Sequence, residues 1–173
     1  MENIVLIGMP GCGKSTLGVL LAKALGMAFV DTDVVLQAQH GKKLQQMIEE
    51  SGIDAFLARE EECVASLACD HTVIATGGSV VYGKKAMLHL HEGGTVVYIR
   101  LPYEVISRRL SNLATRGVTL RPGQTLFDLY QERVPLYENE ADLFFDAEDA
   151  SLEETAQQLA ERLRVSGGAR DAR

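Results

Sequence analysis

The sequence predicts an α/β fold in which a five-stranded parallel sheet lies between two layers of helices. Three observations carry this prediction. Short apolar segments rich in β-branched residues alternate with segments whose apolar residues recur at helical spacing. A glycine-rich turn follows the first apolar segment at once. The chain has 173 residues, of which 46% are hydrophobic and 24% charged, which suits a folded globular protein.

The predicted strands are short and almost wholly apolar, as expected for parallel strands that are buried on both faces. Their ranges are 3–7, 28–30, 72–75, 95–99 and 143–145. Ligands of such sheets bind beyond the carboxyl ends of the strands. We therefore expect the functional residues in the segments that follow the strands.

Helical spacing of apolar residues predicts a helix after each of the first strands, and the flanking residues mark where several helices begin or end. Gly26 is typical of a helix C-terminus, Pro102 of a first helical turn and Ser151 of an N-cap. The predicted helices span 14–25, 34–39, 44–50, 53–68, 84–91, a segment after Pro102, 126–139 and a segment after Ser151.

Length and composition predict one domain over residues 1–165. The stretch 111–125 is polar and contains glycine and proline, so we interpret it as a mobile lid. Residues 166–173 lack an apolar period and are predicted to be a flexible C-terminal tail.

The formal net charge of −7 argues against a general nucleic-acid or anionic-membrane binder. No apolar run approaches the roughly 20 residues that span a bilayer, and the opening residues lack a signal-peptide pattern. The three cysteines show no metal-binding or disulfide spacing, which favours a reducing compartment. We expect a cytoplasmic monomer.

Residues 8–15 read Gly-Met-Pro-Gly-Cys-Gly-Lys-Ser, which is the pattern G-x-x-x-x-G-K-[ST] between a predicted strand and a predicted helix. Backbone N–H groups of such a loop surround phosphate oxygens, and the helix N-terminus adds partial positive charge. Lys14 is expected to reach the β- and γ-phosphates, and Ser15 to ligate Mg²⁺. The predicted cofactors are ATP and Mg²⁺, and the predicted nucleotide-binding residues are Gly11, Cys12, Gly13, Lys14, Ser15 and Thr16.

Two further polar segments follow predicted strands and are expected at the same edge of the sheet. Asp31-Thr32-Asp33 follows the second strand, and Gly77-Gly78-Ser79 follows the third. A phosphoryl acceptor needs a carboxylate near its hydroxyl, which either aspartate could supply. The other interpretation is that one aspartate caps the helix that follows.

A base-reading Asn-Lys-x-Asp signature is absent, which argues against a GTPase. The chain resembles the shikimate kinase family in residues 8–15, in Asp31-Thr32-Asp33, in Gly77-Gly78 and in Glu132-Arg133-Val134-Pro135-Leu136-Tyr137. The resemblance spans nearly the whole chain. It implies a three-layer P-loop kinase fold and an ATP-dependent kinase that phosphorylates a small hydroxylated metabolite.

The same resemblance implies roles for individual residues. Asp31 would assist Mg²⁺ binding, Asp33 would hold and deprotonate the attacking hydroxyl, and Arg133 would bind a carboxylate of the acceptor. Gly77 and Gly78 would lie against the acceptor. Either Arg116 or Arg121 of the lid would reach the transferring phosphate on closure.

Two departures from the family pattern fall in the acceptor-binding half. Leu57 stands where the family has an arginine, and Arg59 lies about 200° away around a helix, so it does not simply replace that arginine. Ser79 stands where the family has a third glycine.

Three hypotheses follow from these motifs and departures. The first is a kinase of shikimate or a related hydroxy acid with an altered acceptor pocket. The second is a nucleotide or nucleoside kinase, and the third is a non-catalytic nucleotide-binding relative of shikimate kinase.

Overall fold

A computed structural model describes residues 2–111, 118–147 and 151–168 of the chain. Its centre is a five-stranded sheet in the order β2-β3-β1-β4-β5, and every neighbouring pair is parallel. The strands are β1 (Asn3–Ile7), β2 (Ala28–Asp31), β3 (Thr72–Ala75), β4 (Gly94–Arg100) and β5 (Leu143–Asp146). All five predicted strands are therefore present, with ends that differ by at most one residue from the prediction.

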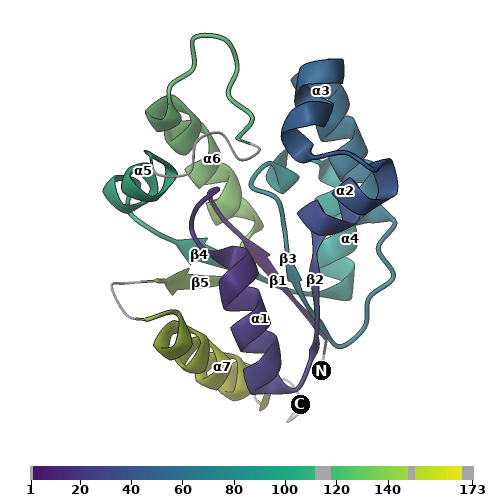
Figure 1. Cartoon of the computed structure of the whole chain (residues 1–173). Helices are drawn as coiled ribbons and strands as arrows, with labels where there is room; N and C mark the ends of the chain where they lie inside the picture. The colour runs from purple at the N-terminus through teal and green to yellow at the C-terminus, as the bar shows by residue number, and fades with distance from the viewer. Residues whose placement is uncertain (1, 112–117, 148–150, 169–173) are drawn as a thin grey trace.

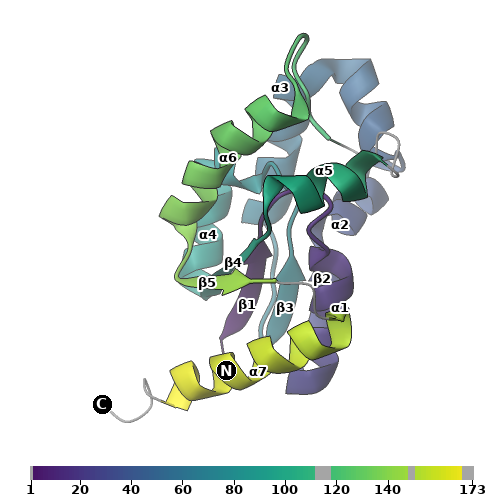
Figure 2. The same cartoon turned by 90° about the vertical axis from the view of Figure 1, so that its left-hand side faces the viewer.

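Helices cover both faces of this sheet, which confirms the predicted three-layer α/β fold. Figure 2 shows α1 on one side of the strands and α4 and α6 on the other. Helix α7 packs along α1, whereas α4 and α6 contact β4. The bounds are α1 (Lys14–Leu25), α2 (Thr32–His40), α3 (Leu44–Ala65), α4 (Lys84–Gly93), α5 (Tyr103–Ser111), α6 (Leu126–Glu140) and α7 (Leu152–Gly168), with a short 3₁₀ turn η1 (Val80–Tyr82).

The central strands are buried because they lie between the helical layers. Every residue of β1 and β3 is buried, and β4 is buried from Val96 to Ile99. Helix α1 approaches the sheet closely at Gly18, where a Cβ would lie 2.6 Å from the Phe29 ring. An alanine there would push the helix off the strands, so this glycine is required for packing.

Predicted helix ends agree with local chemistry. Gly26 ends α1 in the left-handed region with φ 70°, a conformation that favours glycine. The break between the two helices predicted over 44–50 and 53–68 is Gly52, with φ 81° and ψ 167° inside α3. Thr125 and Asp128 form a capping box at the start of α6.

Several helices depart from the predicted bounds. Helix α3 ends at Ala65 rather than at residue 68, and α4 ends at Gly93 rather than at residue 91. Helix α2 begins at Thr32 rather than at residue 34, because the Asp31 side chain caps its first turn. Helix α7 continues to Gly168, so residues 166–168 of the predicted tail are helical. Ser151 and Glu154 cap the N-terminus of α7, whereas its C-terminal bound is not one that composition alone locates.

No helix in the described ranges is long and apolar enough to cross a membrane. The same residues contain no cluster of three or more histidine, cysteine or acidic side chains that could hold a metal ion.

Candidate active site

The predicted functional segments meet at the carboxyl edge of the sheet. The loop after β1, the start of α2 after β2 and the segment after β3 are neighbours, because β1, β2 and β3 are adjacent in the sheet order. Figure 1 shows that residues 118–125, which precede α6, also lie beyond this edge of the sheet. The topology therefore places the glycine loop, both aspartates and Gly77 together, as the sequence predicts.

The loop from Gly8 to Ser15 has the backbone of a phosphate-binding turn. Gly8, Gly11 and Gly13 have φ values of 145°, 77° and 93°, a region that L side chains rarely adopt. Gly13 leads directly into the first turn of α1. N–H groups at a helix N-terminus have no intrahelical partner, which makes this end of α1 a suitable position for an anion.

Lys14 is buried against its own loop. Its Nζ donates hydrogen bonds to Gly8 O at 2.7 Å and Met9 O at 3.0 Å, and it lies 3.6 Å from Cys12 Sγ. Carbonyl oxygens carry only partial negative charge, so an ionised phosphate would compete well for this ammonium group. The Cys12 thiol is buried and serves as packing for the loop rather than as an exposed group.

Ser15 and Thr16 are exposed on the first turn of α1, where their hydroxyls are accessible to a ligand. Asp31 Oδ1 accepts hydrogen bonds from the backbone N–H groups of Asp33 and Val34. The capping interpretation of Asp31 is therefore correct for one of its oxygens. The other oxygen, Oδ2, has no hydrogen bond to a described residue.

Asp33 lies on the first turn of α2 between the glycine loop and the segment after β3. Burial, together with the neighbouring Asp31, raises the pKa of the Asp33 carboxyl to about 6, although the Lys14 ammonium opposes the shift. A carboxylate with such a pKa is ionised at pH 7 yet more basic than an exposed aspartate. These are the properties of a general base near neutral pH.

Arg133 projects from α6 into the same site and is only 1% exposed. Its guanidinium donates hydrogen bonds to the Tyr82 hydroxyl and to Thr119 Oγ1, and it lies over the Tyr82 ring at 5.2 Å. Arg133 has no ion pair with a carboxylate of a described residue. A buried cation without a counter-charge is a ready partner for an anionic ligand.

The two glycines after β3 allow the other site residues to pack closely against the backbone. A Cβ on Gly77 would come closer than 3.0 Å to both Glu60 Oε1 and Asp33 Oδ1. A Cβ on Gly78 would lie 2.7 Å from Pro10 of the glycine loop and 3.1 Å from Arg133 Nη1. The fully buried Tyr137 donates its hydroxyl to Gly78 O and fixes this segment against α6.

Glu60 is the site residue that the sequence reasoning missed. It is 3% exposed, and its Oε2 accepts a hydrogen bond from Ser79 Oγ at 2.6 Å. Residues 60–62 are three consecutive glutamates, and no role is assigned to any of them from the sequence. Helical phase could have separated them, because Glu60 is four residues after Phe56 and three before Cys63, and both of those side chains are buried.

The two departures from the family pattern have different surroundings. Leu57 packs against an apolar cluster that contains Leu36, Met47 and Phe56. Arg59 donates to Ser51 Oγ at 2.8 Å, away from Arg133, so the prediction that it does not replace the missing arginine agrees with its placement. Ser79, in contrast, enters the site by holding Glu60.

Of the two candidate lid arginines, Arg121 is described and Arg116 lies outside the described residues. Arg121 Nη2 is 3.1 Å from Asp54 Oδ1 on α3, and both side chains are well exposed. The lid segment is fixed near its base by Thr119, which is buried beside Arg133.

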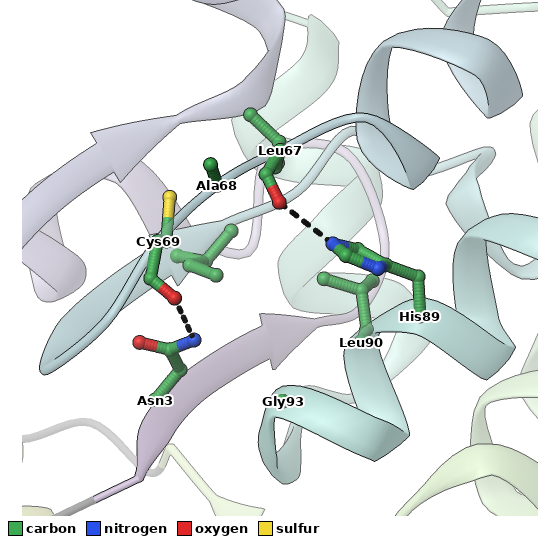
Figure 3. A pocket seen from close by; sticks show the side chains of 8 residues that line it. Asn3, Leu67, Ala68, Cys69, His89, Leu90 and Gly93 are labelled. Carbon is green, nitrogen blue, oxygen red and sulfur yellow. Dashed lines mark hydrogen bonds between the residues drawn. The ribbon is translucent and has the colours of Figure 1, made fainter.

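A separate pocket of about 370 Å³ lies at the opposite, amino edge of the sheet (Figure 3). Asn3 Nδ2 donates to Cys69 O there, and the His89 ring donates to Leu67 O. Leu90 adds an apolar wall. None of the predicted site residues lines this pocket, and its polar groups are already bonded to backbone carbonyls.

A protein-family model described as shikimate kinase matches residues 10–164. This chain belongs to the shikimate kinase family. The match includes residues 10–15 of the glycine loop, both aspartates, Gly77, Gly78 and Arg133. The protein is therefore a phosphotransferase whose acceptor is an alcohol group of a small metabolite.

Curated shikimate kinases match almost the whole chain. The protein from Thermodesulfovibrio yellowstonii is 36% identical over 172 residues, which cover 97% of this chain and 99% of the relative. The protein from Pseudomonas fluorescens is 38% identical over 152 residues, which cover 86% of this chain and 88% of the relative.

Solved structures of the family share the fold. Shikimate kinase from Acinetobacter baumannii in complex with shikimate has a TM-score of 0.88 and 29% identity, and the match covers 96% of this chain and 94% of that one. Shikimate kinase from Aquifex aeolicus has a TM-score of 0.80 and 32% identity over 96% of this chain and 98% of that one. These matches confirm the predicted P-loop kinase fold.

Proposed function

We propose that the protein transfers the γ-phosphoryl group of ATP, with Mg²⁺, to a hydroxyl of shikimate or a closely related hydroxy acid. The observation that carries the choice of acceptor is Arg133. It is a buried guanidinium with no ion pair to a described residue, and it lies beside Gly78 on the edge where Asp33 also lies. A small molecule with both a carboxylate and a hydroxyl satisfies the two groups together.

The loop geometry fits a nucleotide. Three glycines hold positive φ values, so successive N–H groups turn toward one position, and the helix N-terminus reinforces that position. Lys14 would leave Gly8 O and Met9 O to contact the β- and γ-phosphates. Ser15 and the second oxygen of Asp31 would hold Mg²⁺, which would neutralise phosphate charge in the usual way.

Asp33 would act on the acceptor hydroxyl. Its Oδ1 lies against Gly77, where a side chain would displace it. Asp33 would orient the hydroxyl toward the γ-phosphorus and accept its proton as the new oxygen–phosphorus bond forms and the bond to the β-phosphate oxygen breaks. The raised pKa of Asp33, about 6, matches this role.

Arg133 would bind the acceptor carboxylate and thereby set the distance from that carboxylate to the reacting hydroxyl. Its Nε and Nη2 are held by Tyr82 and Thr119, so the guanidinium is already oriented. Arg116 or Arg121 would add positive charge near the transferring phosphate. The resemblance to the family, rather than a contact in this structure, supports that last role.

The test is ADP release measured with a panel of hydroxy acids, polyols, nucleosides and nucleoside monophosphates, with mass spectrometry of the product. We expect a phosphomonoester of shikimate or a related hydroxy acid, formed only with ATP and Mg²⁺. Faster turnover of a nucleoside or nucleoside monophosphate would contradict the proposal, and so would ATP binding without turnover of any panel member.

A further inference from the structure

The buried Arg133 is held by hydroxyl groups rather than by carboxylates. Its Nε donates to the Tyr82 hydroxyl at 3.2 Å, and its Nη2 donates to Thr119 Oγ1. The Tyr82 ring also lies 5.2 Å from the guanidinium carbon. A neutral hydroxyl fixes the direction of a guanidinium without cancelling its charge, so the charge remains available to an anionic ligand.

The third nitrogen of this guanidinium lies beside the segment after β3. Nη1 is 3.1 Å from the position that a Cβ of Gly78 would occupy. An arginine binds a carboxylate either along its side, through Nε and Nη2, or at its end. Tyr82 and Thr119 occupy the side. A carboxylate of the acceptor is therefore expected at the Nη1 end, whose direction depends on the groups that hold Nε and Nη2.

Tyr82 comes from a turn that is rigidly joined to the glycine segment. It is the last residue of η1, and its backbone N–H donates to Ser79 O at 3.0 Å. Val80 and Val81 of the same turn are buried and anchor it to the core. The Tyr82 side chain thus links the segment after β3 to helix α6 at a fixed place.

Glu132 determines the direction of the hydrogen bond between Tyr82 and Arg133. Its Oε1 accepts a hydrogen bond from the Tyr82 hydroxyl, and its Oε2 accepts one from Gln124 Nε2 at 2.8 Å. A hydroxyl has a single proton, so a Tyr82 hydroxyl that donates to Glu132 presents only lone pairs to Arg133. Glu132 itself forms no ion pair with Arg133.

The residue at position 57 makes the orientation of Arg133 more important. Leu57 packs against an apolar cluster, so this position supplies no second cation for a carboxylate. When one guanidinium carries a contact, a small error in its placement is not compensated by a neighbour. A group that fixes Arg133 is then expected to influence which acceptors are used.

We propose that Tyr82 is a positioning residue that sets the selectivity of the enzyme for acceptors with a carboxylate, and that Glu132 supports it by holding its hydroxyl proton. This inference rests on the proposed function. Tyr82 acts through Arg133 and not by touching the acceptor. It aims Nη1 at the carboxylate, and so favours a hydroxy acid over a polyol or over an ester of the same acid.

The main test is Tyr82→Phe, which keeps the ring over the guanidinium and removes only the hydroxyl. We expect the KM for the acid to rise about 10-fold, the lower end for a lost hydrogen bond to a charged group. The kcat and the KM for ATP should stay nearly unchanged. The methyl ester of the same acid should show little loss, so the ratio of kcat/KM for acid and ester should fall about 10-fold.

Tyr130→Phe is the matched control. Tyr130 is also a half-buried tyrosine, and its hydroxyl donates to Leu101 O rather than contacting Arg133. This variant loses one hydrogen bond to the protein and should keep the wild-type discrimination between acid and ester. Thermal unfolding of both variants shows that each is folded under the conditions of the assay.

Glu132→Gln is a second variant that tests the support of the Tyr82 hydroxyl. Glu132 is exposed, and an amide oxygen still accepts a hydrogen bond. We therefore expect a smaller rise in the KM for the acid, about 2- to 5-fold, the size usual for exposed charged contacts. The ester should again show little loss.

A double-mutant cycle with Arg133→Met shows whether Tyr82 acts through Arg133. Methionine is unbranched and similar in length, and it has no nitrogen for Tyr82 to hold. Once Arg133 is removed, Tyr82→Phe should cause no further loss with the acid. Calorimetric binding of the acid and its ester to the full chain measures the same cycle without turnover.

The proposal is overturned if Tyr82→Phe leaves the discrimination between acid and ester unchanged, or if it loses the same factor with both. It is also overturned if the losses of Tyr82→Phe and Arg133→Met simply add. Failure of the proposed function looks different, since no hydroxy acid would then be phosphorylated, while binding of the acid would still separate the wild type from Tyr82→Phe.

Discussion

The nucleotide half and the acceptor half of this site differ in how their charged groups are satisfied. In the nucleotide half, Lys14 is bonded to loop carbonyls and Asp31 caps a helix, so these charged groups have protein partners. In the acceptor half, Arg133 has no ion pair with a described residue and Glu60 Oε1 has no described hydrogen-bond partner.

The difference reflects what each half recognises. A phosphate chain is read mainly by backbone N–H groups, which any sequence with the right glycines provides. An acceptor is recognised by individual side chains. Some of their polar atoms have no partner in the protein and remain available to the ligand, which lowers the stability of the fold. The departures at positions 57 and 79 accordingly fall in the proposed acceptor half, where we expect a single substitution to change selectivity.

The largest expected effect is in the nucleotide half. Lys14→Ala should abolish phosphoryl transfer and weaken ATP binding, because no other described side chain of the loop carries positive charge to the β- and γ-phosphates. Steady-state kinetics and ATP titration measure both effects. Lys23→Ala, an exposed lysine of the same helix, is the control, and normal turnover by a folded Lys14→Ala protein would remove the phosphate-loop assignment.

Asp33→Asn should affect catalysis without affecting ATP binding, and so distinguish the acceptor half from the nucleotide half. We expect kcat to fall about 100-fold or more, the usual contribution of a general base, while the Kd for ATP stays nearly unchanged. Asp70→Asn, at the amino edge of the sheet, is the matched control. A large loss of ATP affinity with normal kcat would place Asp33 in the nucleotide half instead.

Leu57→Arg tests whether the acceptor half is built to bind the carboxylate of shikimate. A second guanidinium near Arg133 should lower the KM for shikimate by about 10-fold, the size of one charge-assisted hydrogen bond. Leu57→Met, which keeps an apolar side chain of similar volume, controls for packing. If Leu57→Arg raises the KM or lowers kcat/KM on the preferred acceptor, the pocket is built for a different ligand.

The smallest effect is on stability. Because the folded-state pKa of Glu60 is raised to about 7, ionisation of this carboxyl opposes folding. The penalty is absent below about pH 4.5, the range of an unfolded glutamate, and grows as the pH rises through 7. Glu60→Gln should therefore gain about 1–3 kcal/mol in unfolding free energy relative to the wild type between pH 5 and pH 8.

Chemical denaturation of both proteins at several pH values measures this difference. The exposed Glu62→Gln variant should show no such trend. A difference between Glu60→Gln and the wild type that stays constant with pH would mean that the Glu60 carboxyl has an ordinary pKa in the folded protein.

The fold was accessible from the sequence because its signals are local. Strand ranges follow from apolar runs, and the breaks at Gly26 and Gly52 follow from glycine in a left-handed conformation. The phosphate loop is contiguous, so its residues are recognised together. Asp33 and Gly77 lie 44 positions apart, yet their approach follows from the rule that parallel strands end at one edge.

The part that sequence reasoning missed depends on pairing between distant side chains. Ser79 was recognised as a departure from the family pattern, but its hydrogen bond to Glu60 joins residues 19 positions apart on a helix and a loop. The residues next to Ser79 in the sequence do not show whether its hydroxyl bonds to another side chain or to solvent. Likewise, Arg133 is in a helix with charged neighbours, and only the packing of Tyr82 and Thr119 around it shows that it is buried.

The most direct test of the whole account compares shikimate with its methyl ester in one coupled ADP-release assay with the wild-type protein. The account predicts that shikimate is phosphorylated and that the ester, which lacks the anion for Arg133, loses about 10- to 100-fold in kcat/KM. Equal turnover of the acid and the ester would contradict it, because the buried guanidinium would then have no part in recognising the acceptor.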